Sequence, residues 1–255
     1  MNAYFSASIV PMPHPVHPYF RPYWYGIFFN PFFLTRKGLF QAIKKNSHYI
    51  KGKVLDFGCG NKPYAAVFDT DQYTGLDYDT EISRKNLKQG VDVLYDGRNI
   101  PFADEHFDSA FSSEVLEHVF NPEEILAEIH RVLKPGGHLL LSCPFFWPEH
   151  EQPYDYARYT SFGLKHLIEK HGFEMVHYQK TGSYFECLLQ GWVLYLFFFI
   201  PHKPKVLEVI FFSIFITPFL ATGLLLAALL PQKIKRSDFY LNNVVIARKK
   251  AATEE

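Results

Sequence analysis

The chain has 255 residues, and its 26 basic and 26 acidic side chains balance to a formal charge of zero. This balance gives no electrostatic reason to expect a nucleic-acid partner. Cys59, Cys143 and Cys187 are far apart and form no CxxC pair, which argues against both a zinc site and a disulfide framework and fits a reducing compartment. The length suffices for one sizeable α/β domain with an appended segment.

The first 31 residues are rich in proline and aromatic residues. Because prolines interrupt any helical run, we expect residues 1–31 to form a non-helical arm. His14 and His17 lie among these prolines, but no carboxylate or cysteine joins them nearby, so we expect no metal there. The first ten residues lack a positive region ahead of an apolar stretch, which does not fit a secretory signal peptide.

From residue 32 onward, helical and strand-like patterns alternate along the chain. This alternation predicts an α/β fold, a mainly parallel sheet with helices on both faces. A helix is expected over 32–49, another from Val115 to Leu133, which Lys134–Gly137 would end, and a third over 161–171. The expected strands are 53–57, 72–77, 91–96, 107–112, 138–142, 173–178 and 239–247.

A long apolar insertion separates the sixth and seventh expected strands. Residues 188–200 and 206–230 are nearly all apolar, and the short polar stretch 201–205 lies between them. Compact domains favour short connections, so we interpret residues 184–236 as an added hydrophobic helical hairpin. The expected organisation is an arm at 1–31, an α/β domain made of 32–183 and 237–250, the insertion at 184–236, and a tail at 251–255.

The first expected strand ends in a glycine turn, Gly58-Cys59-Gly60. Glycines at such a turn let the backbone approach a ligand closely. The dinucleotide fingerprint requires a third glycine where this chain has Pro63, which disfavours a nicotinamide enzyme. Asp56, two residues before the first glycine, suits a cationic ligand amine better than a pyrophosphate.

Four segments carry a resemblance to a known family: VLDFGCG, TGLDYD, VDVLYDGRNIPFADEHFDSAFSSEVLEHV and LAEIHRVLKPGGHLLLSCP. Together they cover roughly residues 50–180, in the order and at the spacing of the class I S-adenosylmethionine-dependent methyltransferases of the methyltransferase type 11 kind, which the chain resembles. The resemblance implies a Rossmann-like seven-stranded sheet whose seventh strand is antiparallel. It also implies S-adenosyl-L-methionine as the cofactor.

The resemblance assigns cofactor contacts to the ends of the first four strands. Glycines 58 and 60 would line the methionine and ribose, and Asp56 would lie near the cofactor's amino end. Asp77 would bind the ribose hydroxyls and Asp96 would face the adenine amino group, although both could instead cap the turns that follow their strands. The complete expected set is Asp56, Gly58, Cys59, Gly60, Asp77, Tyr78, Asp96, Gly97, Ser113 and Glu114.

The stretch after the fifth strand, 144–160, would border the pocket for the methyl acceptor. It resembles a subgroup with an HExPYDxxRYT segment, often associated with glycan or envelope-lipid assembly. His150 is the best candidate for a general base because its ordinary pKa is near neutral, and Tyr154 or Asp155 could serve instead. The alternative is a structural lid in which Asp155 pairs with Arg158. His118 is expected to serve in packing, and no metal is expected.

Three interpretations of the insertion compete. A soluble helical lid is disfavoured because a helix that is apolar all round must be buried. Spanning requires two crossings, which would put Lys203 and Lys205 on the far side, against the positive-inside tendency. We therefore expect a monotopic or re-entrant hairpin at the cytoplasmic face of a membrane. Lys233, Lys235 and Arg236 would then meet anionic headgroups.

A membrane location predicts a methyltransferase that acts on a membrane-borne or amphipathic acceptor. A lipid-linked glycan intermediate is the first expectation, and a quinone or other isoprenoid lipid is the second. The alternative from a different class is a catalytically silent, cofactor-binding membrane scaffold. The complete set of cofactor residues argues against the scaffold, which would have no need to keep it.

Overall fold

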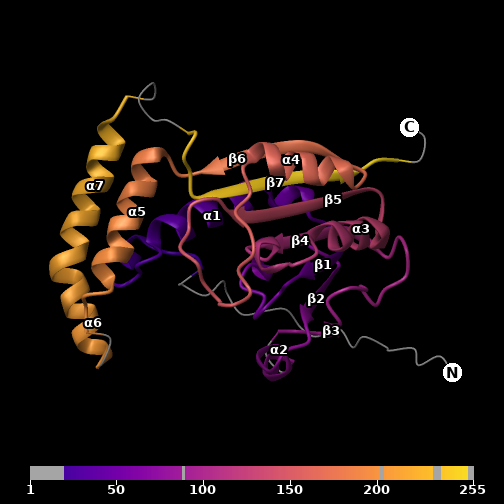
Figure 1. Ribbon diagram of the computed structural model, residues 1–255, viewed down its shortest axis with the longest axis horizontal. Coiled ribbons are helices and arrows are strands. Elements are labelled where there is room, and N and C mark those ends of the chain that lie inside the picture. Colours follow the sequence, from indigo (N-terminus) through magenta and orange to yellow (C-terminus); the bar gives the residue numbers. More distant parts are fainter. Residues whose placement is uncertain (1–19, 88–89, 202–203, 232–236, 252–255) are drawn as a thin grey trace.

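The computed structural model describes residues 20–87, 90–201, 204–231 and 237–251. A seven-stranded sheet of order β3-β2-β1-β4-β5-β7-β6 forms its centre (Figure 1). β7 pairs antiparallel with both β5 and β6, whereas the other pairings are parallel. The expected fold class is therefore confirmed. The strands are β1 (Lys53–Phe57), β2 (Gln72–Tyr78), β3 (Val93–Tyr95), β4 (Phe107–Ser113), β5 (Leu133–Pro144), β6 (Phe173–Thr181) and β7 (Asn242–Lys249).

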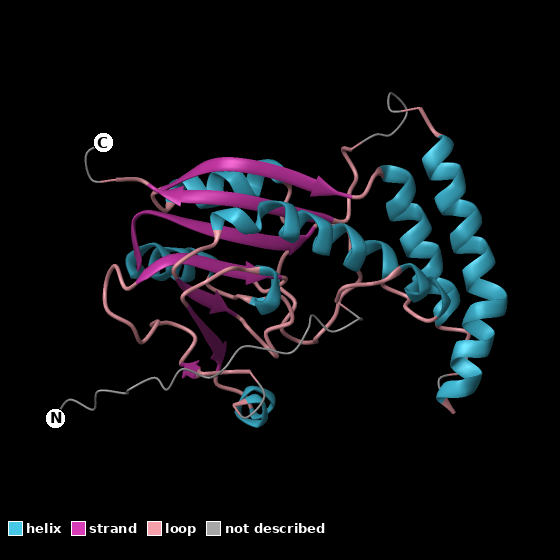
Figure 2. Ribbon diagram, turned by 180° about the vertical axis from the view of Figure 1, so that it is seen from behind, coloured by secondary structure: helices cyan, strands magenta, loops and turns pink. Residues whose placement is uncertain are grey.

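Helices cover both faces of the sheet, so two apolar cores form. On one face α1 (Phe33–Asn46) contributes Leu39 and Ile43, both fully buried. On the other face α3 (Pro122–Val132) and α4 (Ser161–Lys170) contribute apolar side chains such as Ile129 and Leu164. Figure 2 shows α1 lying across its face of the sheet. The shorter elements are η1 (Trp24–Phe28), η2 (Ser47–Tyr49), η3 (Ala65–Val67), α2 (Glu81–Asn86) and η4 (Leu116–His118).

Several expected boundaries were wrong, and three of them have a physical reason. The helix after β4 begins at Pro122, since a proline fits the first helical turn, and only the short turn η4 stands where its first half was expected. Residues 134–137 belong to β5, which starts at Leu133 and pairs with β4 from there. The last strand is β7 at 242–249 rather than 239–247, because its pairing with β5 begins at Asn242.

The insertion between β6 and β7 is helical, as expected. It comprises α5 (Tyr184–Phe197), α6 (Lys205–Phe211), a π-helical turn η5 (Phe212–Ile216) and α7 (Thr217–Leu229). The last three follow one another without a break, so Lys205–Leu229 is one helix of 25 residues. Both helices stand together at one end of the sheet (Figure 1). Lys203, Lys233, Lys235 and Arg236 lie outside the described residues, as do His14 and His17.

The described part of the N-terminal arm, residues 20–31, packs against this insertion. It contains the 3-10 helix η1, so the expectation of a non-helical arm was wrong there. The Ser213 hydroxyl donates a hydrogen bond to the Phe28 carbonyl at 3.1 Å, and the Thr217 hydroxyl donates to the Ile27 carbonyl at 2.9 Å. The buried Gln190 amide of α5 donates to the Pro31 carbonyl at 2.7 Å. These bonds satisfy backbone carbonyls that apolar helices would otherwise leave without partners. Arm and insertion therefore share one apolar cluster.

Candidate cofactor and acceptor site

The expected cofactor residues gather at the carboxyl ends of β1, β2, β3 and β4. Open α/β sheets bind ligands at this edge because the loops that leave parallel strands converge there. Asp56 lies near the end of β1 and Asp77 near the end of β2, and in the register of the sheet Asp56 pairs with Gly75, two residues before Asp77. Asp96 follows β3, and Ser113 closes β4.

Asp56 is a buried carboxyl group with one strong neutral partner. It is 2% exposed, and the Tyr73 hydroxyl donates to its Oδ2 at 2.7 Å. Burial raises the pKa of Asp56 to about 7, although the bond from Tyr73 and the charge of Lys62 act in the opposite direction. A cationic group placed beside Asp56 would stabilise its ionised form. The geometry therefore suits the ammonium group that the family places here.

The glycine turn is held to the end of β2 by Asp77. The Gly60 N–H donates to Asp77 Oδ2 at 3.0 Å, and the Tyr78 N–H donates to Oδ1 at 2.8 Å. Gly58 and Gly60 have φ of +72° and +48°, which favours glycine at both positions. A Cβ at Gly58 would lie 2.4 Å from the Val115 side chain, whereas one at Gly60 would meet open space. The turn thus leaves room beside Gly60 for a ligand.

Asp96 is engaged in the turn that follows β3. Its Oδ1 accepts the backbone N–H groups of Arg98 and Asn99, both at 2.8 Å. These bonds lower the pKa of Asp96, so the group is a carboxylate at neutral pH. Gly97 has φ +84°, and a Cβ there would lie 2.9 Å from the Tyr78 ring. The turn-capping role is therefore present, and the contact of Asp96 with adenine stays a prediction.

Glu114 is half-buried and follows the end of β4, where the family resemblance places it in the wall of the site. The Ser142 hydroxyl donates to Oε1 at 2.8 Å and the Asn242 amide donates to Oε2 at 2.7 Å. Burial raises the pKa of Glu114 to about 7 against these two bonds. Its φ of +57° is unusual for a residue with a side chain. Asn242 escaped the sequence analysis because it follows the insertion, far along the chain.

A small cavity lies beside Asp56 and the glycine turn. It has a volume of about 50 Å³, and Asp56, Gly58, Ser113 and Arg36 are among its lining residues. Phe20 also lines it, and the Arg36 guanidinium lies 4.3 Å from the centre of the Phe20 ring. This volume admits a small polar group such as the amino-acid end of S-adenosylmethionine, while Asp77 and Asp96 lie beyond it. A larger hollow, lined by residues such as His48 and Asp108, lies at the opposite edge of the sheet and plays no part in this site.

The three expected catalytic residues lie in the loop after β5 but face different neighbours. Asp155 is held by Arg158, whose Nη1 and Nη2 donate to its two carboxylate oxygens at 2.5 and 2.7 Å. These bonds hold the pKa of Asp155 well below its usual range. His150 Nδ1 lies 3.2 Å from Asp155 Oδ2, and the Tyr154 ring is largely exposed. The pairing of Asp155 with Arg158 matches the lid alternative, and the catalytic roles remain predictions.

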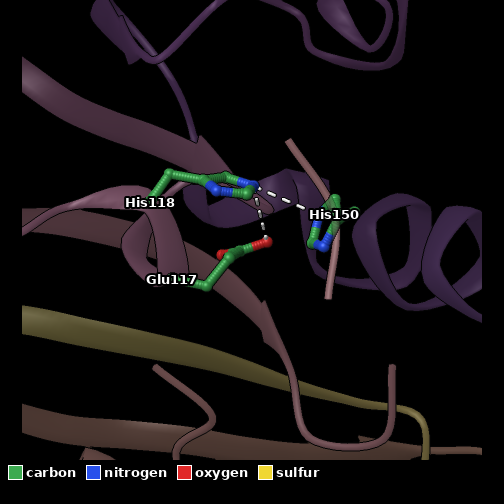
Figure 3. A group of neighbouring side chains, drawn as sticks. All are labelled: Glu117, His118 and His150. Carbon is green, nitrogen blue, oxygen red and sulfur yellow. Dashed lines mark hydrogen bonds and ion pairs between the residues drawn. The ribbon is translucent and has the colours of Figure 1, made fainter. Parts of the chain in front are cut away.

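His150 also meets two residues of η4. Its Nε2 lies 3.1 Å from His118 Nε2, and Glu117 Oε1 lies 3.8 Å from the same His118 nitrogen (Figure 3). His118 and Glu117 are adjacent in the sequence, but His150 reaches them only because the loop after β5 folds back over η4. Sequence reasoning assigned His118 to packing and did not find this group.

The middle of the sheet matches a known family. Residues 55–141 match the model of a methyltransferase domain. The chain is 35% identical over 95 residues to a ubiquinone/menaquinone biosynthesis C-methyltransferase of Desulfotalea psychrophila, which is 34% of this chain and 39% of that protein. It is 29% identical over 181 residues to a sterol 24-C-methyltransferase of Pneumocystis carinii, which is 56% of this chain and 47% of that protein. The chain thus spans about half the length of these curated relatives or less.

A solved structure supports the fold. A phosphoethanolamine N-methyltransferase of Haemonchus contortus, in complex with S-adenosyl-L-methionine, superposes with a TM-score of 0.52 at 20% identity. The alignment covers 84% of this chain and 53% of that one. The matched domain contains the glycine turn, Asp56 and Asp77, which are the residues whose geometry suits the cofactor. Residues 55–141 therefore match a methyltransferase domain, and S-adenosylmethionine is the cofactor that such a domain uses.

Proposed function

We propose that this protein transfers a methyl group from S-adenosylmethionine to an acceptor that resides in a membrane. The observation that carries the proposal is the exposed apolar insertion at the edge of the sheet where the cofactor residues gather. β6 is parallel to β5, because both are antiparallel to β7, so β6 ends at this same edge. The insertion begins three residues after β6 ends.

The loop that borders the acceptor pocket packs on the insertion. A Cβ at Gly191 of α5 would lie 3.2 Å from the Phe146 ring, so helix and loop are in close contact there. Phe146 also belongs to the apolar cluster that joins the arm to the insertion, and Trp147 lies beside Phe32 with ring centres 5.5 Å apart. An acceptor delivered along the insertion would therefore arrive next to this loop.

The outer surface of the insertion is too apolar for water alone. Its long helix has a mean hydropathy of 2.3 in its most apolar window, of which 28% is buried. Apolar patches of this extent on a soluble surface mark interaction sites. The most exposed apolar side chains of arm and insertion are Trp24, Trp192, Phe198, Phe199, Val206, Ile214, Phe215, Leu225 and Leu229.

An in-plane or re-entrant hairpin fits the helix lengths better than a spanning one. The 25-residue helix is long enough to cross, but α5 has 14 residues, which is about 21 Å of helix against a hydrocarbon core of about 30 Å. Because β6 and β7 belong to one sheet, a single crossing cannot return the chain to it. The three cysteines are free and buried, which fits the reducing, cytoplasmic side of the membrane.

Two classes of acceptor have support. The HExPYDxxRYT segment favours a lipid-linked glycan, through its resemblance to a subgroup associated with glycan or envelope-lipid assembly. The quinone and sterol C-methyltransferases among the relatives favour an isoprenoid lipid. Both classes combine an apolar tail with a more polar reacting end, which suits a pocket beside a membrane surface.

The chemistry requires alignment more than acid–base catalysis. S-adenosylmethionine supplies a methyl group on a cationic sulfur, and the group moves in one displacement that forms the bond to the acceptor as the bond to sulfur breaks. An acceptor hydroxyl must also lose its proton. His150 is the residue that we propose for this task, since Asp155 orients its imidazole through Nδ1.

The test is transfer of radiolabelled methyl from S-adenosylmethionine in membrane extracts of the host, followed by solvent partitioning. Label in the lipid-soluble fraction, lost with the Asp77→Ala protein, is the expected result. Treatment with mild acid then separates the two acceptor classes. Acid hydrolyses the glycosyl-phosphate linkage and releases a labelled glycan into water, whereas a labelled quinone or sterol stays in the lipid-soluble fraction. Label confined to water-soluble products would contradict a membrane-borne acceptor.

Methyl transfer separates a silent scaffold from an enzyme, and calorimetry tests the cofactor binding that both require. The scaffold alternative predicts no methyl transfer in any fraction while S-adenosylmethionine still binds to the folded protein. A folded sample that does not bind the cofactor would refute both.

A further inference from the structure

The two imidazoles of His118 and His150 face each other with their Nε2 atoms 3.1 Å apart. His118 Nδ1 lies 2.8 Å from the Tyr154 carbonyl oxygen, which can only accept a hydrogen bond, so Nδ1 carries the proton. A neutral His118 then has a lone pair at Nε2, directed at His150 (Figure 3).

The Nδ1 atom of His150 also faces a hydrogen-bond acceptor. Its Nδ1 lies 3.2 Å from Asp155 Oδ2, which is an ionised acceptor because Arg158 binds it. Arg158 Nη2 is also 3.5 Å from this Nδ1, but it is closer to Asp155 Oδ2, at 2.7 Å. With Nδ1 as donor, His150 also presents a lone pair at Nε2. Two lone pairs at 3.1 Å repel each other unless a positive species lies next to both.

Glu117 adds a buried carboxyl group at the same place. Its side chain is 0% exposed, and among the described residues neither carboxylate oxygen has a hydrogen-bond partner. A buried carboxylate that accepts no hydrogen bond is strongly unfavourable and needs compensation by a cation or a proton. Oε1 lies 3.8 Å from His118 Nε2, and the three ligand atoms of Glu117, His118 and His150 all lie within 4.8 Å of one another.

We propose that Glu117, His118 and His150 together bind one divalent transition-metal cation. Ligand atoms around tetrahedral zinc lie about 3.3 Å apart, given bonds of about 2.0–2.1 Å, so the separations of 3.1 and 3.8 Å need only small movements. The Glu117 carboxylate lies within 4.8 Å of His150 Nε2 and would move closer to it. Two imidazoles and one carboxylate suit Zn²⁺, Mn²⁺, Fe²⁺ or Co²⁺ better than Mg²⁺, which prefers oxygen ligands and water. The hydrogen bonds at both Nδ1 atoms are the outer contacts that typically orient metal-bound histidines.

This site revises the expectation that the protein holds no metal. Three protein ligands leave at least one coordination position open, as in catalytic metal sites. If the proposed methyl transfer uses an oxygen acceptor, an acceptor hydroxyl could fill that position and lose its proton more readily. His150 would then bind the metal through Nε2, so the same nitrogen could not also accept the proton of the acceptor hydroxyl. Metal binding itself does not depend on methyl transfer.

The experiment measures binding of Co²⁺ and Zn²⁺ to the full-length protein in detergent, after dialysis against a chelator. One equivalent of Co²⁺ should give visible d–d absorption typical of a low-symmetry site with nitrogen ligands, and Zn²⁺ should displace it. Metal binding should weaken in each of three variants, His118→Ala, His150→Ala and Glu117→Gln. The loss should be at least roughly 10- to 100-fold, which is the effect of removing a residue that only hydrogen-bonds to a metal ligand. His166→Ala, which alters an exposed histidine of α4, should bind as the wild type does.

Glu117→Gln guards against loss of folding. It keeps the shape of the side chain and removes a buried charge, so the metal-free variant should melt no lower than the wild type. Thermal unfolding and cofactor calorimetry report folding independently of the metal. Absence of stoichiometric binding in a folded wild-type protein would overturn the proposal and leave a shared proton as the species between the imidazoles. Binding that the three substitutions leave unchanged would do the same.

Discussion

Asp77 has two separable tasks, and its substitution should affect them by different amounts. Its carboxylate accepts the N–H groups of Gly60 and Tyr78 and, by the family assignment, also accepts the ribose hydroxyls of the cofactor. A hydrogen bond to a charged acceptor contributes about 1.5–3 kcal/mol. Loss of two of them in Asp77→Ala should weaken cofactor binding by at least about 3 kcal/mol, or about 100-fold.

The effect on folding should be smaller. The two N–H groups lie near solvent in the free protein, so their lost bonds cost about 1 kcal/mol each, which lowers Tm by about 4–8 °C in a domain of this size. Asp77→Asn keeps an oxygen acceptor for one N–H group and is the matched control for the charge. Isothermal titration calorimetry with S-adenosylmethionine gives the affinity, and thermal unfolding gives the stability. An Asp77→Ala affinity within about threefold of wild type, under 0.7 kcal/mol, would refute the placement of the ribose.

Three further predictions concern other regions. The double substitution Ile214→Asp and Phe215→Asp should reduce binding to anionic vesicles at least about 100-fold, because each exposed apolar side chain contributes about 1.5–3 kcal/mol when it leaves water. Leu87→Asp, on the other side of the sheet, is the control, and equal cosedimentation of the two variants with vesicles would exclude this face as the anchor. Arg158→Ala should destabilise the protein by about 1.5–3 kcal/mol, because it removes the charged partner of Asp155 and leaves only the contacts from His150. An unchanged denaturant midpoint would contradict this. Asp56→Asn should remove a pH dependence of the stability of the cofactor-free protein. Because the pKa of Asp56 is about 7 in the folded protein and 3.8 in the unfolded chain, ionisation of Asp56 lowers the free energy of unfolding by about 1.4 kcal/mol per pH unit between about pH 4 and 7. Denaturant titrations in which the free energy of unfolding changes equally with pH in both proteins would contradict this.

The sheet could be predicted because each strand carries its own local pattern of apolar residues and turns. The boundaries around η4 could not, because Val115 and Val119 fit a helical stripe as well as they fit an extended segment and a short turn. Only the pairing of Leu133 with Phe107 shows that residues 134–137 continue a strand. Tertiary pairing therefore overrides local propensity at these places.

Part of the candidate site could be predicted from the sequence and part could not. The glycine turn, Asp56 and Asp77 lie directly after strands, so the family order along the chain placed them at one edge of the sheet. The contact of Asn242 with Glu114 spans 128 residues, and that of His150 with His118 spans 32. Such contacts depend on how the insertion and the loop after β5 fold back, which no local pattern specifies.

The arm connects two regions that are otherwise separate in function. Phe20 lines the cavity beside Asp56 and Gly58, while a few residues further on Ile27 and Phe28 accept hydrogen bonds from the long helix of the insertion. A displacement of that helix at a bilayer surface would pull on the segment that partly covers the cavity. If the insertion docks on a bilayer as proposed, lipid contact would be mechanically coupled to access of the cofactor, and S-adenosylmethionine should enter the membrane-bound protein and the free protein at different rates.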